Sequence, residues 1–179
     1  LISPATAPSN VRPIRIPHVL SARSIALAAG SCKRGVGWPL PTETTMIGQQ
    51  RQLIMRFLAE PTDVNYGGKV HGGQVMKWID QAGYAAAVGW SGKYSVTVAV
   101  GGIRFVAPIR ISDLVTVETT LVHTGTSSMH FAVDVRARDP MQDDGERLCT
   151  HCVIVFVALD GVEGTPVAVP AWTPDSDED

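Results

Sequence analysis

The sequence predicts an α+β fold in which an antiparallel sheet wraps around one long central helix. Two observations carry this prediction. Residues 71–90 form one long segment with helical periodicity, and six short apolar runs rich in β-branched residues flank it. No second helical segment separates the runs that follow, so a doubly wound parallel sheet is excluded. Antiparallel pairing is therefore expected.

The elements follow in a simple order along the chain. A strand is expected first, and a loop rich in Asp, Asn and Gly then leads into the helix. Five further strands follow, and the polar segment 138–147 is predicted to be a hairpin turn between the last two. The open edges of such a sheet invite pairing with a second subunit. The expected strands are 52–58, 94–100, 103–109, 114–125, 128–138 and 147–159.

The composition predicts one folded domain, over residues 46–170. Residues 1–45 contain six prolines without sustained periodicity, which favours disorder or a segment upstream of a natural start at Met46. A transit peptide is the alternative, since residues 1–42 carry five basic residues and no acid, but the prolines interrupt an amphipathic helix. Residues 171–179 form an acidic tail that is expected to be solvated.

Charge and hydropathy exclude two classes of partner. The 137 residues after Thr42 hold 10 basic and 17 acidic residues, so the body is acidic and lacks the basic surface of a nucleic-acid-binding protein. No apolar run reaches the ~20 residues of a membrane-spanning helix, so no membrane span is expected. A cytoplasmic location is predicted.

Cys149 and Cys152 form a CxxC pair, which raises a redox or zinc-binding interpretation. The flanking residues are apolar and β-branched, and strand residues three apart point to opposite faces. Two separate thiols in a reducing compartment are therefore expected, with no metal site.

The helix carries one acidic residue, Asp80. At ~100° per residue, the face that must pack on the sheet consists of Val75, Ile79, Ala82 and Ala86, opposite a polar stripe. Asp80 falls on the shoulder between these faces, among small or apolar neighbours. A surface ion pair with Lys77 is the simplest interpretation. The preceding loop favours a functional interpretation instead. Gly72 and Gly73 leave backbone N–H groups bare at the helix start, where they could hold a developing oxyanion, and Asn65 lies just upstream.

These residues belong to a longer pattern. The segments "MRFLAEPTDVNYGGKVHGGQVMKWIDQAG", "VTVAVGGIRFVAPIRISDLV" and "HTGTSSMHFAVDV" resemble, in order and spacing, the acyl-CoA thioester hydrolases of the hotdog superfamily, both the bacterial YciA type and the mammalian cytosolic long-chain type. The resemblance covers about residues 49–170. One departure is Ser112, which stands where the family has glycine, before the retained Asp113.

The resemblance implies a hotdog fold, homodimers with shared active sites and assembly into trimers of dimers. By position, Asp80 matches the family's helix acid, and Asn65 matches an amide that the partner subunit supplies. Backbone N–H groups of Gly72 and Gly73 are expected to bind the thioester oxygen. Ser127 and Ser128 lie near the family's coenzyme A site, and Arg104 is a candidate for its phosphates.

The predicted reaction is hydrolysis of acyl-CoA to a fatty acid and CoA, with Asp80 as general base or as nucleophile. CoA enters as part of the substrate, and no separate cofactor is expected. The sequence contains no G-x-S-x-G motif and no helical His pair for zinc. A non-catalytic acyl-CoA-binding or oligomerising module is the alternative, and a hotdog dehydratase is disfavoured by the order and spacing of His71 and Asp80.

Overall fold

The computed structural model describes residues 47–143 and 145–174. The predicted extension 1–45, the proposed start at Met46 and the end of the acidic tail lie outside these residues. Of that tail, Trp172 is described, and its backbone N–H donates to Thr124 Oγ1 at 2.9 Å. Within the described ranges no helix combines the length and hydropathy needed to cross a membrane.

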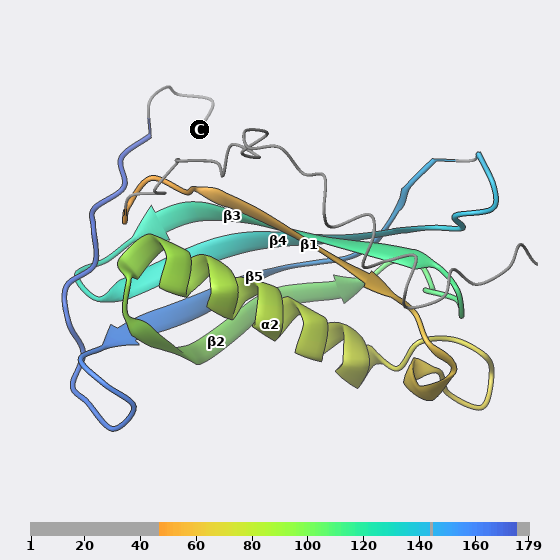
Figure 1. Ribbon diagram of the computed structural model, residues 1–179, viewed down its shortest axis with the longest axis horizontal. Helices are drawn as coiled ribbons and strands as arrows, with labels where there is room; N and C mark the ends of the chain where they lie inside the picture. The colour runs from red at the N-terminus through yellow and green to blue at the C-terminus, as the bar shows by residue number, and fades with distance from the viewer. Residues whose placement is uncertain (1–46, 144, 175–179) are drawn as a thin grey trace, which may run out of the picture. The chain divides into compact units, whose positions relative to one another are not determined.

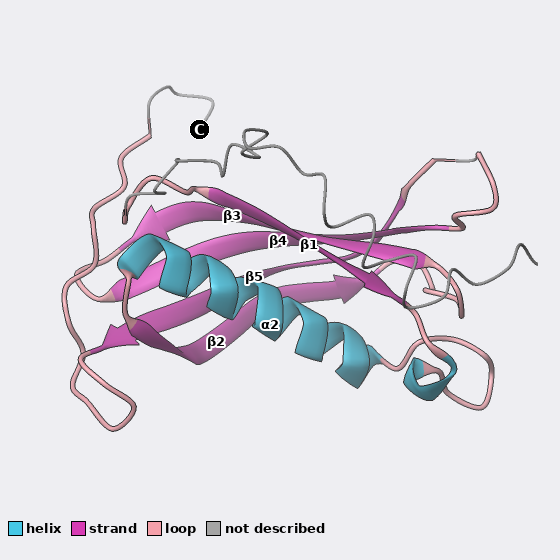
Figure 2. Ribbon diagram, viewed as in Figure 1, coloured by secondary structure: helices cyan, strands magenta, loops and turns pink. Residues whose placement is uncertain are grey.

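One long helix packs on a five-stranded antiparallel sheet, as Figures 1 and 2 show, so the predicted fold class is confirmed. The strand order is β1-β3-β4-β5-β2, and every neighbouring pair is antiparallel. A short 3-10 turn, η2 (Pro61–Asp63), precedes the helix. The elements are α2 (Gly72–Ser91), β1 (Gln52–Leu58), β2 (Tyr94–Phe105), β3 (Leu114–Thr124), β4 (Ser128–Arg138) and β5 (Arg147–Leu159).

The core lies between α2 and the inner face of the sheet. All four residues predicted to face the sheet are buried: Val75, Ile79, Ala82 and Ala86. Burying each large apolar side chain is worth about 1.5–3 kcal/mol, so this face holds the helix in place. A Cβ on Gly83 would lie 2.7 Å from Phe156, so glycine allows the helix to approach the sheet there.

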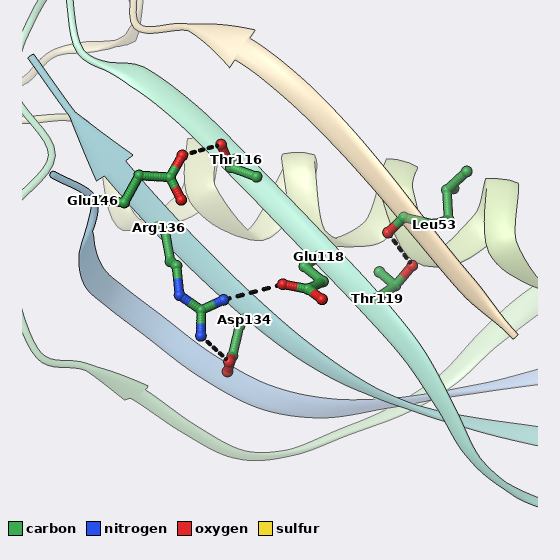
Figure 3. A network of polar contacts seen from close by, with 7 residues as sticks. All are labelled: Leu53, Thr116, Glu118, Thr119, Asp134, Arg136 and Glu146. Atoms are coloured by element: carbon green, nitrogen blue, oxygen red, sulfur yellow. Dashed lines mark hydrogen bonds and ion pairs between the residues drawn. The ribbon is translucent and has the colours of Figure 1, made fainter. Parts of the chain in front are cut away.

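The outer face of β3 and β4 is polar, as Figure 3 shows. The Arg136 guanidinium lies between the carboxylates of Glu118, at 3.2 Å, and Asp134, at 2.9 Å. These groups are about one third exposed, and ion pairs of this kind contribute little to stability. The strict alternation of buried and half-buried residues along β4 follows from one apolar and one polar face.

The prediction of separate strands at 94–100 and 103–109 was wrong. A single strand, β2, runs from Tyr94 to Phe105 and pairs with β5 along its length. The Gly101–Gly102 pair looks like a turn in sequence, but it forms a bulge, with Gly102 at φ 63° and a register shift before Arg104. Residues 106–109 continue as a loop that contains Pro108.

Cys149 and Cys152 are free and both are buried in the core. The expectation of opposite faces was wrong, because a register shift in the β4–β5 pair places an extra residue at Cys149 and interrupts the alternation. Burial raises the pKa of the Cys152 thiol to about 11, and it also raises the pKa of Cys149. Thiols of this kind are unreactive at neutral pH.

Candidate active site

Asp80 lies on the exposed shoulder of α2 that the helical wheel predicts. No ion pair with Lys77 occurs in the described structure; instead Asp80 Oδ1 accepts a hydrogen bond from Thr97 Oγ1 at 2.5 Å. This bond fixes one carboxylate oxygen, while Oδ2 has no hydrogen-bond partner among the described residues. The simple interpretation of Asp80 as a surface ion-pair partner is therefore wrong.

Sequence reasoning missed Thr97. The residue lies in β2, opposite Phe156 of β5, and Phe156 faces the core. Thr97 therefore points toward the helix, and the adjacent bulge at Val98 ends the regular register just beside it. The alternating run around Thr97 indicates a strand. Only the packing of β2 next to α2 brings the Thr97 hydroxyl to Asp80.

The start of α2 leaves backbone donors uncovered. His71 is the N-cap residue and its side chain makes no capping hydrogen bond, while its carbonyl accepts from the N–H groups of Gln74 and Val75. Neither Gly72 nor Gly73 has a hydrogen-bond partner for its N–H among the described residues. A Cβ at Gly73 would meet nothing within 4 Å, so this end is open. Bare N–H groups at the positive end of a helix dipole suit a developing oxyanion.

Asn65 is fixed in the loop before α2. Its Oδ1 accepts from the N–H groups of Gly67, at 2.9 Å, and Lys69, at 3.3 Å, and its own N–H donates to the Lys69 carbonyl. This Asx turn uses only Oδ1 within the described chain, so the amide Nδ2 remains available as a donor. The side chain is exposed.

One protomer does not bring these three groups together. Asp80 follows Gly72 by eight residues, which corresponds to about 12 Å along the helix axis. A single carbonyl group therefore cannot contact both the helix start and the carboxylate of the same chain. Asn65 lies farther back, beyond the helix start.

The edge of β2 is open next to Asp80. In the part of the chain that the structure describes, β2 pairs only with β5. Val98 is 55% exposed and Phe105 is 55% exposed along this edge. Exposed apolar side chains on an unpaired strand mark a surface for association.

The three residues predicted to contact coenzyme A lie elsewhere in the protomer. Phe105 faces Gly72, so the adjacent Arg104 points to the opposite, outer face, where His151 is its pairing neighbour. Ser127 lies in the β3–β4 turn, and Ser128 Oγ lies 3.4 Å from His130 Nε2. Among the described residues no hydrogen bond or ion pair joins these three to Asp80, and their role stays a prediction.

A pocket of about 320 Å³ opens beside the helix start. Its walls come from the loop before α2, the first turn of the helix, the end of β2, the segment after it and β5. Among the described residues no group of His, Cys, Asp and Glu is arranged to hold a metal ion. The residues that line the pocket include Val70, Gly72, Val75, Phe105, Ile109 and Thr150.

Comparison with known proteins decides the family. The model of the Thioesterase superfamily matches residues 67–143. The acyl-CoA thioester hydrolase YciA of Escherichia coli is 33% identical over 129 residues, which cover 71% of this chain and 97% of YciA. The chain belongs to the acyl-CoA thioester hydrolases of this superfamily. The resemblance seen in the sequence is thus confirmed.

Solved structures agree with this hydrolase family. The acyl-CoA hydrolase from Staphylococcus aureus, in complex with butyryl coenzyme A, has a TM-score of 0.66 and 28% identity, covering 74% of this chain and 80% of that one. A hexameric acyl-CoA thioesterase has a TM-score of 0.67 and 26% identity, covering 74% and 84%.

Proposed function

We propose that this hydrolase cleaves acyl-CoA thioesters at a site shared between two subunits, with Asp80 as the reacting carboxylate. The observation that carries the proposal is the exposed Asp80 carboxylate, held by Thr97 beside an open strand edge. In this arrangement the partner supplies Asn65 and the helix start. Within one chain, Gly72 and Asp80 are about 12 Å apart along the helix axis, as estimated from the helical rise, so the helix start must come from a partner.

A related enzyme supports the choice of residues. The Staphylococcus aureus hydrolase has been crystallised as three alanine variants, of an asparagine, an aspartate and a threonine. The spacing of those three positions equals that of Asn65, Asp80 and Thr97. A hexameric broad-specificity acyl-CoA thioesterase has also been crystallised with an aspartate replaced by alanine.

In the proposed reaction a water oxygen attacks the thioester carbonyl carbon, and Asp80 accepts the proton. The carbonyl oxygen becomes an oxyanion that receives hydrogen bonds from the N–H groups of Gly72 and Gly73, worth about 3–4 kcal/mol per donor. The C–S bond then breaks, the thiolate of CoA leaves, and the proton returns to it. Asn65 Nδ2 orients the water or the acyl carbonyl.

Direct attack by Asp80 remains the alternative route, through a mixed anhydride that water then hydrolyses. A single turnover with excess enzyme in water labelled with heavy oxygen separates the two. A general base delivers the label to the fatty acid in that turnover. If Asp80 is the nucleophile and water opens the anhydride at the aspartyl carbonyl, the label enters Asp80 and the fatty acid carries the unlabelled oxygen of the enzyme. Label in Asp80 therefore identifies the nucleophilic route.

The function is tested by release of free thiol from acyl-CoAs ranging from acetyl to palmitoyl. Wild type and a chain beginning at Met46 are expected to turn over the same substrates. A folded oligomer that binds these esters but releases no thiol would favour a non-catalytic acyl-CoA-binding module.

Sharing of the site is tested with mixed subunits. Asp80→Ala and Asn65→Ala are each expected to inactivate a homodimer. Random mixing of the two chains makes half of the dimers mixed, and each mixed dimer has one intact site, so about a quarter of wild-type activity returns. Activity that stays absent after verified subunit exchange would contradict a shared site. Dimers, and hexamers as trimers of dimers, are expected from light scattering.

A further inference from the structure

Thr150 differs from the other buried polar residues of the described chain. Six such residues are buried, and the side chains of the other five are hydrogen-bonded. Figure 3 shows two of these bonds, from Thr116 Oγ1 to Glu146 at 2.9 Å and from Thr119 Oγ1 to the Leu53 carbonyl at 3.1 Å. The other three are Ser91, Ser95 and Asp113.

The Thr150 hydroxyl has no hydrogen-bond partner among the described residues, although the residue is only 1% exposed. No side-chain oxygen or nitrogen of this part of the chain is both enclosed and unpaired. The small exposed area of Thr150 therefore includes its oxygen, and Thr150 lines the 320 Å³ pocket. Its hydroxyl is thus a polar group in that pocket.

Apart from Lys69, the rest of the pocket is mostly apolar, and it adjoins the proposed oxyanion site. Gly72 forms one side of the opening, with Val75 and Phe105 beside it. The N–H of Val70 donates to the Ile109 carbonyl at 2.9 Å, so two walls are tied together. An acyl chain whose carbonyl oxygen is bound at the helix start would extend into this space.

The size and polarity of the pocket restrict the acyl group. If a methylene group needs about the space of one water molecule, roughly 30 Å³, the pocket holds on the order of ten such groups. A saturated chain that reaches Thr150 would remove water from the hydroxyl without replacing the hydrogen bond, which is unfavourable. An acyl group that carries an oxygen there would restore the bond.

We propose that Thr150 is a specificity-determining residue, which makes this pocket favour short or medium acyl groups bearing a hydroxyl or keto oxygen over saturated chains of equal length. The proposal rests on the proposed hydrolysis at the helix start. A site that hydrogen-bonds a substrate oxygen discriminates against the analogue that lacks it, because its own polar group is then left unpaired.

The test uses matched pairs of substrates, butyryl-, hexanoyl- and octanoyl-CoA with their β-hydroxy counterparts. Thr150→Val removes the hydroxyl at nearly constant volume, and the ratio of kcat/KM for the hydroxylated over the saturated ester is expected to fall about tenfold for the best pair. Thr150→Ser keeps the hydroxyl and is expected to retain the preference. Thr119→Val is the control, since it removes a buried hydroxyl whose partner is the Leu53 carbonyl.

An unchanged ratio in folded Thr150→Val, or the same fall in Thr119→Val, would overturn the proposal while leaving the hydrolase function intact. Absence of turnover in wild type would instead contradict the proposed function.

A binding measurement gives a readout that is independent of turnover. It uses calorimetry with ketone analogues of the same acyl-CoAs, in which a methylene group separates the sulfur from the carbonyl. The quantity compared is the ratio of the affinity for the hydroxylated analogue to the affinity for its saturated counterpart. For the best pair, this ratio is expected to be about tenfold higher in wild type than in Thr150→Val. Equal relative affinities would overturn the assignment.

Discussion

Asp80 and Asp113 are both retained from the pattern that the sequence shares with hotdog hydrolases, but their surroundings differ. Asp113 is 3% exposed; its Oδ2 accepts from the N–H of Arg110 at 2.7 Å and pairs with the Arg147 guanidinium. Asp80 is exposed and has one side-chain donor, Thr97.

The difference distinguishes a carboxylate that stabilises the fold from one that is accessible to a substrate. Asp113 closes the turn after Ile109, and its backbone carbonyl also accepts from Ala59, so it joins that turn to the end of β1. The Asp113 carboxylate is buried while the Arg147 side chain is 34% exposed, so removing the carboxylate charge leaves the guanidinium without its partner at the edge of the core. Asp80 keeps one oxygen free, so its removal disturbs little of the fold. Matched substitutions of the two aspartates test this contrast.

The largest effect is expected for Asp80→Asn, which preserves size and removes the basic carboxylate. General-base catalysis typically contributes 10²–10⁴-fold, so kcat should fall about a thousandfold. The free energy of unfolding should change by less than about 0.5 kcal/mol, because the residue is exposed. Thiol-release kinetics and urea denaturation measure the two quantities. Near-normal turnover would remove Asp80 from the reaction.

Asp113→Asn is expected to show the opposite behaviour. The amide oxygen can still accept from Arg110 and Arg147, but the negative charge facing the guanidinium is lost, and the expected loss is about 1.5–3 kcal/mol of unfolding free energy. Molecules that remain folded should keep most of their kcat. A midpoint in urea close to that of wild type would show that the pair does not stabilise the turn.

Thr97→Val is expected to have a smaller effect, and on activity alone. The substitution removes the single donor to Asp80 while keeping the shape of the side chain, so the carboxylate loses its fixed orientation. A loss of about 1.4 kcal/mol, or tenfold in kcat/KM, is expected. Thr116→Val, whose hydroxyl bonds Glu146 on the outer face, is the control and should leave kcat/KM unchanged.

Ser112→Gly is expected to have the smallest effect. It should change only the stability of the turn that holds Asp113, and not the activity. Ser112 has φ 68°, a left-handed conformation that costs a non-glycine residue about 1–2 kcal/mol. Glycine removes this strain but loses more entropy on folding, so a net gain of about 0.5–1 kcal/mol is expected. Thermal unfolding measures it. A lower melting temperature would mean that the serine side chain supports the turn.

Much of the fold was predictable because it depends on local patterns. The first strand and the helix lie within a residue of the predicted bounds, since alternation and helical periodicity are properties of neighbouring residues. The continuous β2 was missed because Gly101–Gly102 permits either a turn or a bulge. Pairing with β5, which is distant in sequence, selects the bulge.

The candidate site was predictable in part. The position of Asp80 on the helix shoulder followed from the wheel, and its role remains a prediction. Thr97 was missed because a threonine in an apolar strand gives no signal of its own. The bridge to Asp80 appears only when β2 lies beside α2.

By itself the sequence determined the type and order of most secondary-structure elements, the buried face of the helix and the family, because each is encoded in residue spacing along the chain. The tertiary structure decided which side chains meet. It set Thr97 against Asp80, placed Arg147 on Asp113 and left the Thr150 hydroxyl open to a pocket. The two hydrogen-bonded contacts join residues 17 and 34 positions apart, and the cavity at Thr150 lies between segments that are distant in sequence. Strand order and register fix them, and both arise from packing of the whole core.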